Sequence, residues 1–300
     1  MTGKRRRSSI KRVKAMAKRL AFFLGCALPS AQLFAEASTR LSLQDLGVEI
    51  VDLEGATCCP DPEISRTLGP DLWIRMAARN LALAEAAKAD TFTVCNGCWE
   101  TLSEAQEMLT KDSKLREEVN RDLEKLGLRY TAKFKIYHAI EVFHDVVGIG
   151  AVESMIKRKF KGIKLAIQPG CRIYKRPEKN LVEKMRKLVQ VLGCEVVDLQ
   201  LERLCCGVPL MYTDTDYSLM ERTKAKLDEI RTKSAQGIVT FCPACYDRME
   251  KGQLELNTRG ENYNIPVLSY SELLAFALGH EPDDYGSYLH KLDYAKVFMG

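Results

Sequence analysis

The sequence contains no apolar run long enough to cross a membrane. Its longest greasy stretches lie near Ala21–Leu28 and Leu273–Leu278, whereas a membrane-spanning helix needs about 20 apolar residues. It also lacks the C-x2-C-x2-C-x3-C run of ferredoxins, and Gly148-Ile-Gly150 lacks the third glycine of a dinucleotide-binding fingerprint. These absences exclude a transmembrane protein and predict no built-in ferredoxin or nucleotide-binding module. The remaining composition, 46% hydrophobic and 28% charged, is typical of a soluble globular protein.

Acidic residues are missing from the first 20 positions, which hold nine Lys or Arg residues. Because the whole chain has a formal net charge of +5, the residues after this leader carry a net charge of −4. The folded part is therefore not expected to present a basic surface to nucleic acid. We interpret residues 1–20 as a basic leader outside the fold, either disordered or an artefact of the assigned start.

The two halves of the chain repeat each other. An apolar run that ends in Gly-Cys occurs at Ala21–Cys26 and again at Leu165–Cys171. The segments Gly47–Leu53 and Gly193–Leu199 are each followed by two adjacent cysteines, and a third apolar run in each half leads into C-x2-C. The offset between the halves is 145 residues at the first cysteine and 147 at the others. The sequence therefore predicts a duplicated domain.

The repeated runs are short, rich in Val, Ile, Phe and Leu, and bounded by Gly or Pro, as buried strands are. A fourth strand is expected in each half, at Phe134–Ile140 and Ile265–Ser269. Stretches with helical spacing of apolar residues separate the strands: Ala31–Leu46, Trp73–Lys88, Glu104–Leu126, Lys179–Leu192, Tyr217–Ser234 and Ser271–Leu278.

This alternation predicts an α/β protein with two similar domains, each a small parallel sheet flanked by helices. The cysteine loops would lie at the carboxyl ends of the strands, where such sheets bind their ligands. We expect the first domain at residues 21–150, the second at 160–285 and a C-terminal tail at 286–300.

Ten of the eleven cysteines belong to the repeat and are the candidate metal ligands. Their spacing is C-x31-CC-x35-C-x2-C in the first half and C-x33-CC-x35-C-x2-C in the second. Thiolates suit zinc, copper(I) and iron–sulfur clusters. We call the two groups the first thiol set (Cys26, Cys58, Cys59, Cys95 and Cys98) and the second thiol set (Cys171, Cys205, Cys206, Cys242 and Cys245).

Several chemistries compete for these thiols. Structural zinc takes four ligands and would leave one thiol of each set idle, although zinc in one set stays open as a lesser possibility. Disulfides would leave an odd thiol in each half and need an oxidising compartment. A thiol-exchange catalyst would use only the C-x2-C pairs, neither of which is predicted to open a helix. An iron–sulfur cluster has several irons and can employ all five thiols, so we favour it.

The residues around the cysteines resemble the cysteine-rich CCG domain, and the chain over about residues 20–285 resembles the B subunit of heterodisulfide reductases. The resemblance includes both cysteine sets and the surrounding segments Phe22–Cys26, Val51–Pro60, Ala78–Glu85 and Cys95–Cys98. It departs from the motif that gives the domain its name at Pro60, where that motif has glycine. The resemblance implies that each thiol set holds one non-cubane [4Fe-4S] cluster and that the two clusters face one another across a disulfide-binding site.

The resemblance also implies an activity: reduction of the disulfide between coenzyme M and coenzyme B, as in methanogenesis, at the clusters themselves and without a protein nucleophile. The implied partners are a ferredoxin-like iron–sulfur C subunit and a flavin-containing A subunit of the same complex. Alternatively, the chain is an electron-transfer subunit of a lactate, glycolate or succinate dehydrogenase relative, or of a sulfur-oxidation complex. A zinc-stapled, non-enzymatic assembly module is a more distant alternative.

A few other residues stand near these motifs. Arg172, Lys175 and Arg176 follow Cys171 and are weak candidates for holding an anionic thiol substrate, since a solvated loop is the simpler interpretation. The eleventh cysteine, Cys194, occupies the place of Val48 in the repeat and is expected to be a buried thiol that behaves as a small hydrophobe. The histidines fall outside the repeated motif and are not assigned a role.

The leader bears on the expected location of the protein. Its basic residues and the apolar run after them imitate a secretory signal, with Leu24-Gly25-Cys26 imitating a lipoprotein cleavage site. Cleavage there would delete a strand and a candidate ligand whose counterpart, Cys171, is kept in the second half. We therefore expect a cytoplasmic protein, with twin-arginine export as the lesser alternative.

Overall fold

The computed structural model describes residues 18–298 and contains two four-stranded sheets in which every strand pairing is parallel. The first sheet has the order β2-β1-β3-β4 and the second β6-β5-β7-β8. The strands are β1 (Lys18–Phe22), β2 (Val48–Asp52), β3 (Asp90–Thr93), β4 (Ile136–His138), β5 (Lys164–Gln168), β6 (Glu195–Val196), β7 (Gly237–Thr240) and β8 (Val267–Ser269). The duplicated α/β architecture is confirmed. Residues 1–17, and with them most of the basic leader, lie outside the described residues.

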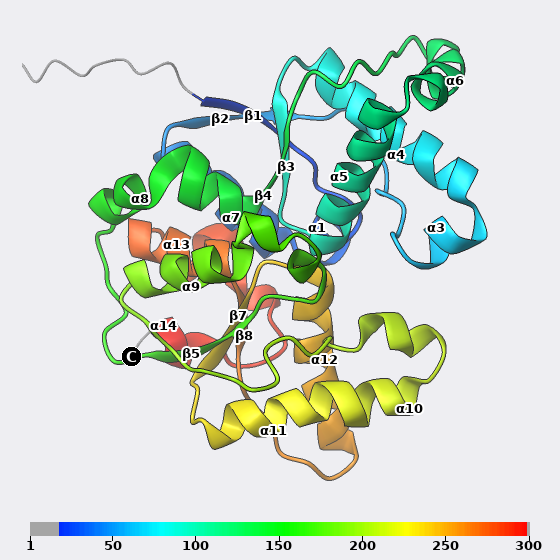
Figure 1. Cartoon of the computed structure of the whole chain (residues 1–300). Coiled ribbons are helices and arrows are strands. Elements are labelled where there is room, and N and C mark those ends of the chain that lie inside the picture. The colour runs from blue at the N-terminus through cyan, green and yellow to red at the C-terminus, as the bar shows by residue number, and fades with distance from the viewer. Residues whose placement is uncertain (1–17, 299–300) are drawn as a thin grey trace, which may run out of the picture.

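Helices follow the strands in both halves (Figure 1). In the first half they are α1 (Ala27–Ala31), α2 (Leu33–Asp45), α3 (Ile64–Leu68), α4 (Pro70–Ala86), α5 (Asn96–Lys111), α6 (Ser113–Glu124), α7 (Ala139–Glu141), the π-helix η1 (Val142–Gly148) and α8 (Ile149–Met155). The second half contains the 3-10 helices η2 (Arg172–Lys175) and η3 (Pro177–Lys179), α9 (Leu181–Val191), η4 (Val208–Tyr212), α10 (Thr215–Tyr217), the π-helix η5 (Ser218–Lys224), α11 (Ala225–Thr232), α12 (Pro243–Thr258) and α13 (Tyr270–Leu278). Three short helices follow: η6 (Pro282–Tyr285), η7 (Ser287–Leu289) and α14 (Ala295–Phe298).

Two sequence predictions about helices are wrong. The stretch Glu104–Leu126 is not one helix, because Asp112 ends α5 and its carboxylate caps α6, accepting from the amides of Lys114 at 2.9 Å and Leu115 at 3.0 Å. The C-x2-C pairs do open helices, since Cys95 and Cys242 are the residues immediately before α5 and α12. A thiol-exchange catalyst is therefore disfavoured only by the three further thiols of each set.

The two halves pack against each other with approximate two-fold symmetry. Helix α2 of the first half packs on α13 of the second, and the repeat-equivalent pair α9 and α7 does the same on the other side. Near the cysteine loops, α1 packs on α12 and α5 packs on η2. Figure 1 shows α7, α9 and α13 between the two sheets. The domain boundary is therefore a packed, reciprocal interface.

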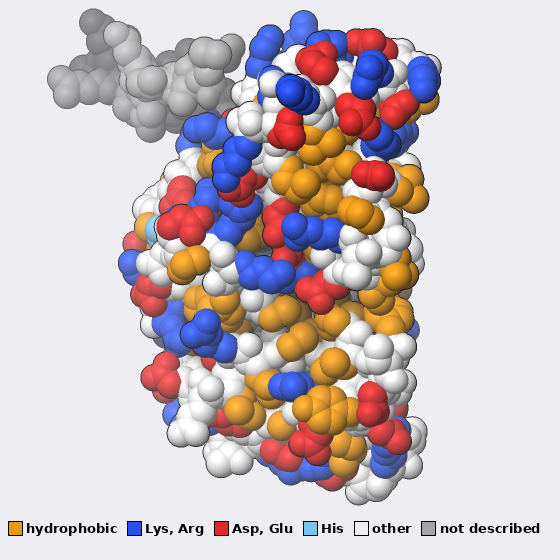
Figure 2. All heavy atoms as spheres, turned by 45° about the vertical axis from the view of Figure 1, so that its right-hand side comes forward, with side chains coloured by type: hydrophobic (Ala, Val, Ile, Leu, Met, Phe, Trp, Pro, Cys, Tyr) orange, Lys and Arg blue, Asp and Glu red, His pale blue; other side chains and the backbone are white. Residues whose placement is uncertain are grey.

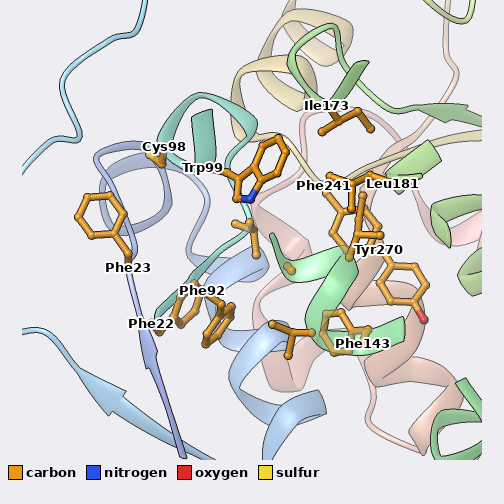
Figure 3. Close-up of a cluster of buried hydrophobic side chains, with 14 of the residues drawn as sticks. Phe22, Phe23, Phe92, Cys98, Trp99, Phe143, Ile173, Leu181, Phe241 and Tyr270 are labelled. Carbon is orange, nitrogen blue, oxygen red and sulfur yellow. The ribbon is translucent and has the colours of Figure 1, made fainter. Parts of the chain in front are cut away.

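One apolar core runs through this interface (Figure 3). The rings of Phe22 and Phe92, on neighbouring strands of the first sheet, stack with centroids 4.4 Å apart. Further along the same cluster, Phe143 from the first half contacts Tyr270 from the second with centroids 5.4 Å apart, and Phe241 stacks on Tyr270 at 4.9 Å. Because the halves share a core, the loops at the carboxyl ends of both sheets hold a fixed relative position.

Phe34 belongs to a second apolar cluster, which also joins the two halves. Its buried side chain crosses from α2 into the second half, with ring centroids 5.0 Å from Tyr246 and 4.5 Å from His290. Phe34→Ala is expected to lower the free energy of unfolding by about 3–5 kcal/mol. The neighbouring Leu33 is 52% exposed, so Leu33→Ala should change the free energy of unfolding by no more than about 0.5 kcal/mol. Equal effects in urea unfolding would mean that the halves do not depend on this contact.

His290 forms a buried hydrogen-bond network close to the same contact. Its Nε2 lies 2.7 Å from Glu272 Oε1 and its Nδ1 lies 2.8 Å from the Tyr246 hydroxyl. The single proton of that hydroxyl goes to Glu250 at 2.8 Å, so both ring nitrogens of His290 act as donors. Burial lowers the pKa of His290, but the carboxylates of Glu272 and Glu250 outweigh it, and the pKa is raised.

The raised pKa predicts a pH-dependent contribution to stability. A histidine with a raised folded-state pKa stabilises the fold fully below its unfolded pKa of roughly 6.5, and this contribution disappears as pH rises through the folded-state pKa. The gap in unfolding free energy between the parent protein and His290→Gln should therefore narrow with rising pH in urea titrations. His280→Gln, which removes a half-buried pair with Asp45, serves as the control. A His290→Gln gap that widens with pH would contradict this network.

Candidate functional site

Three of the five cysteines of each set follow the two strands between which the strand order reverses. In the first sheet β1 is flanked by β2 and β3, so the loops after β1 and β3 leave toward opposite faces of the sheet and form a crevice between them. Cys26 follows β1, and Cys95 and Cys98 follow β3. The second sheet places Cys171, Cys242 and Cys245 in the same way after β5 and β7. The double cysteines follow β2 and β6, each at an edge of its sheet.

The ten thiols form one continuous row across the interface between the halves. Within the first set, each thiol affects the ionisation of the next, in the order Cys26, Cys58, Cys59, Cys98 and Cys95. Cys95 contacts Cys242, and from there the row continues through the second set as Cys245, Cys206, Cys205 and Cys171. The second half of the row is the first in reverse order of repeat-equivalent residues. The approximate two-fold axis therefore passes between Cys95 and Cys242.

The row is buried at its centre and open at one end. Cys59, Cys98, Cys206, Cys242 and Cys245 are buried, whereas Cys26 and Cys58 are exposed, and all eleven cysteines are free thiols. Within residues 18–298 no three or more His, Cys, Asp or Glu side chains converge on a position for a single metal ion. The thiols meet in pairs along a line, which suits a group with several metal atoms better than one tetrahedral ion.

Crowding of the thiols shifts their pKa values in opposite directions. Hydrogen bonds from Cys58 and Cys98 lower the pKa of Cys59 to about 6, and hydrogen bonds from Cys171 and Cys206 lower that of Cys205 to about 2. The thiols that donate these bonds are harder to ionise, and the pKa of Cys206 is raised to about 12 by its bond to Cys205. Neighbouring thiols therefore cannot all ionise together unless positive charge enters the site.

Glycines make room for the last thiol of each set. Gly25 and Gly170, directly before Cys26 and Cys171, have φ angles of +69° and +84°. A Cβ atom on Gly25 would lie 2.8 Å from the Cys98 sulfur, and one on Gly170 would lie 3.4 Å from the Cys245 sulfur and 2.2 Å from Asn96 Nδ2. The repeated Gly-Cys pair in the sequence was the signal for this feature: both the left-handed backbone and the close approach require glycine.

Amide side chains of the first half hold the thiol loops of the second. Asn96 Nδ2 donates to the Pro169 carbonyl at 2.7 Å, and Gln32 Nε2 donates to the Pro243 carbonyl at 2.8 Å. His138 supports Asn96, because its Nε2 lies 2.9 Å from Asn96 Oδ1 while its Nδ1 accepts from the Ile140 amide. Burial lowers the pKa of His138 to about 4, which keeps the ring neutral near pH 7. Sequence reasoning missed this network, since single polar residues in a motif carry no pattern.

The cations that follow Cys171 are paired with carboxylates of the first half. Arg172 bonds to Glu100 and, at 3.1 Å, to Glu63; Lys175 bonds to Glu100; and Arg176 lies 3.0 Å from Glu107. Glu100 is buried, and only 11% of the Arg172 side chain is exposed. A role for these cations in binding an anionic substrate stays a prediction. In the structure, the ion pairs of these cations attach the loop after Cys171 to the first half.

Cys194 lies apart from the row of thiols. It is buried directly before β6, and burial raises the pKa of its thiol to about 12. No other cysteine contributes to this shift, in contrast to the ten repeated thiols. Cys194 therefore provides a cysteine with similar burial outside the site.

The fold and the thiol row define a duplicated cysteine-rich protein of the kind in which each half supplies five thiols. The cysteine-rich domain family named CCG matches residues 20–103 and 165–250, one match in each half. The chain belongs to this family.

Relatives extend over nearly the whole chain. The sequence is 35% identical over 279 residues to the B subunit of the ferredoxin/F(420)H(2)-dependent CoB-CoM heterodisulfide reductase of Methanosarcina acetivorans, covering 90% of this chain and 92% of that protein. It is 27% identical to the "8-methylmenaquinol:fumarate reductase membrane anchor subunit" of Wolinella succinogenes, covering 94% and 100%. It is 24% identical to the "Probable glycolate oxidase iron-sulfur subunit" of Bacillus subtilis, covering 89% and 56%. These relatives support an oxidoreductase role within a multi-subunit complex.

A solved structure has the same fold. A hypothetical protein from Helicobacter pylori superimposes with a TM-score of 0.74 at 19% sequence identity, covering 92% of this chain and 53% of that one. Among the described residues, no helix is both long and apolar enough to span a bilayer.

The thiol row fits an iron–sulfur group on its own chemistry. Soft thiolate donors are the ligands such clusters take, and the Gly25 and Gly170 backbones leave space beside the last thiol of each set. Positive charge from irons would also relieve the repulsion between neighbouring thiolates.

Gly170→Ala tests the space left by these glycines. A Cβ at this position meets Asn96 and requires a strained left-handed backbone, so we expect a loss of about 1–3 kcal/mol in the free energy of unfolding. Gly150→Ala is the control, because Gly150 lies in α8 with nothing within 4 Å of its Cβ position, and it should be neutral or slightly stabilising. If Gly170→Ala and Gly150→Ala lowered the free energy of unfolding by similar amounts in thermal or urea unfolding, the requirement for glycine at position 170 would be contradicted.

Proposed function

We propose that the chain is the catalytic iron–sulfur subunit of a heterodisulfide reductase-type complex. It would hold two non-cubane [4Fe-4S] clusters and reduce the disulfide of coenzyme M and coenzyme B, or a related one, to two thiols. The observation that carries this proposal is the continuous thiol row, in which Cys95 and Cys242 are in contact at the centre. Two separate electron-transfer sites would not need to touch.

Each thiol set would ligate one cluster through its five cysteines. When bound, the two clusters would supply one electron each, which matches the two electrons that a disulfide takes up. The chain itself contributes position and shielding. The buried rings of Trp99 and Phe241 both pack against His138, with centroids 5.7 Å and 5.9 Å from its ring.

The open end of the row offers a route for a substrate. Cys26 and Cys58 are exposed. Beside Gly25 lies a cleft of about 450 Å³, lined mainly by apolar residues of the loops after β1 and β2, including Leu24, Pro29 and Leu53. This volume is within the range of small-molecule sites.

We further propose that a partner supplies the electrons, a ferredoxin-like C subunit fed by a flavin-containing A subunit. Figure 2 shows hydrophobic side chains gathered on the side of the molecule that carries α3, α4 and α10. Leu68 and Leu72 on α3 and α4 are 82% and 63% exposed, and Tyr212 on η4 is 72% exposed. Exposed apolar groups of this size favour a protein contact. Free thiols at the site suit a reducing compartment, and we propose a cytoplasmic complex.

A second candidate is an iron–sulfur electron-transfer subunit of a different reductase or dehydrogenase. The likeness to a fumarate reductase subunit and a glycolate oxidase iron–sulfur subunit favours it. The two candidates share the clusters and differ in what meets them: a disulfide in the first and only electron carriers in the second.

Cysteine substitution tests the ligand assignment. In anaerobically purified protein, Cys98→Ser should remove the iron and acid-labile sulfide of one cluster, about half of the total, because a hydroxyl is a poor soft ligand. Cys245→Ser should do the same for the other half. Cys194→Ser, at a buried thiol outside the row, should leave the content unchanged. Full iron content in both ligand variants, or zinc in the parent protein, would contradict the proposal.

Substrate addition separates the two candidates. If the clusters act on a disulfide, adding the coenzyme M–coenzyme B disulfide to the cluster-containing protein should give a new paramagnetic signal. With a reductant present to supply two electrons per disulfide, two thiols should be released. Glycolate or fumarate should give neither. A protein with full cluster content that shows no response to any disulfide would favour the electron-transfer role.

A further inference from the structure

Lys226 is a buried cation without a carboxylate partner. It lies on α11 with 1% of its surface exposed. Its ammonium donates to the Leu201 carbonyl and, at 3.3 Å, to the Glu202 carbonyl. Within residues 18–298 no Asp or Glu forms an ion pair with it, whereas Lys224, two residues earlier, pairs with two carboxylates. A buried charge without a counter-charge is costly, so its presence calls for a negative neighbour.

The nearest candidates for that negative charge are thiols of the second set. Thr223, one turn before Lys226 on the same face, donates its hydroxyl to the Cys206 carbonyl at 3.0 Å. The carbonyls that Lys226 holds belong to the loop that leads directly into Cys205. Burial lowers the pKa of Lys226, and Cys245 and Cys206 oppose this shift more strongly than the nearby carboxylates of Glu229 and Glu202 do. Lys226 is therefore bonded to the loop that leads into Cys205 and Cys206.

Those nearby carboxylates, Glu202 and Glu229, are engaged elsewhere. Glu202 accepts from Arg186 at 2.7 Å and from the Tyr174 hydroxyl at 3.0 Å. Glu229 accepts from two backbone amides of the loop after β6. Neither carboxylate bonds to the ammonium of Lys226. The thiols of the second set are therefore the groups whose negative charge Lys226 can offset.

The first half carries a cation at the equivalent place. Arg79 precedes Lys226 by 147 residues, which is also the offset between the double cysteines. Its Nη1 is buried without a hydrogen-bond partner, and its Nη2 lies 3.7 Å from the Cβ position of Gly55, in the loop before Cys58. A positive residue at the same position of both repeats is explained if both thiol sets need a nearby positive charge.

We infer that Lys226 offsets the negative charge that the second thiol set carries when it holds an iron–sulfur cluster, and that it thereby raises the reduction potential of that cluster. This inference rests on the proposed function. Reduction adds one electron to a cluster held by thiolates, and a fixed cation nearby stabilises the more negative, reduced form. Arg79 would act in the same way on the first set.

The test is a redox titration of the anaerobically purified, cluster-containing protein, followed by electron paramagnetic resonance with chemical mediators. Lys226→Gln keeps a donor for the two carbonyls but removes the charge, and it should shift the midpoint potential of one of the two clusters to a more negative value. Lys226→Arg keeps the charge and should stay at the parent value. Lys224→Met removes a charge two residues away that is already paired with Asp228 and Glu261, and it should change neither potential.

The outcomes separate charge compensation from a purely structural clamp. Unchanged potentials in Lys226→Gln with full iron content would overturn the inference and leave Lys226 as a holder of the loop. If Lys226→Gln loses iron, the inference requires that Lys226→Arg retain it; loss of iron in both variants would overturn the role of the charge. A parent protein without iron would instead contradict the proposed function.

Discussion

The contact between Cys95 and Cys242 is the constraint on which the rest of the site depends. Two sheets built from repeated sequence each direct five thiols to their carboxyl edges, but only the packing of the halves brings Cys95 and Cys242 together. The reciprocal contacts of α2 with α13 and of α7 with α9 fix that geometry. Because the two halves share a closely packed apolar core, the dimensions of the site between them are fixed. A substrate that must contact both clusters would need such a fixed geometry.

Electrostatics at the thiols follow from the same packing. Ten thiols in a row cannot ionise together in a partly buried site without positive charge, and the protein places cations around them. Arg172 and Lys175 contact Glu100 across the interface, so they hold the halves together. Lys226, in contrast, bonds only to carbonyls of the loop before Cys205. Arg172 and Lys175 therefore stabilise the interface, and we assign Lys226 to the electrostatics of the second thiol set.

Much of the fold could be read from the sequence because duplication doubles the signal. Each apolar run followed by cysteines occurred twice, so strands as short as β6 (Glu195–Val196) were predicted from their better-defined partners. The helix break at Asp112 was missed because one capping residue between two amphipathic stretches has no periodic signature. The start of α5 and the whole of α12 were missed as well, since Gly97 and Pro243 are read as loop residues although proline fits the first turn of a helix.

The site was predictable to the level of residue type but not of contact. Spacing singled out the ten thiols, whereas the order of the row depends on how the halves pack, and this cannot be read from either half alone. Among the polar residues that support the loops, Gln32 and Lys226 belong to no motif, and Asn96 occupies a variable position of the C-x2-C motif. Their roles arise from partners far away in the chain.

The most direct test of this account is diffraction from anaerobically grown crystals, measured on both sides of the iron absorption edge. Two separate groups of iron atoms are expected, one enclosed by each thiol set, on either side of the contact between Cys95 and Cys242. Iron on only one side, or single ions that scatter as zinc, would contradict it.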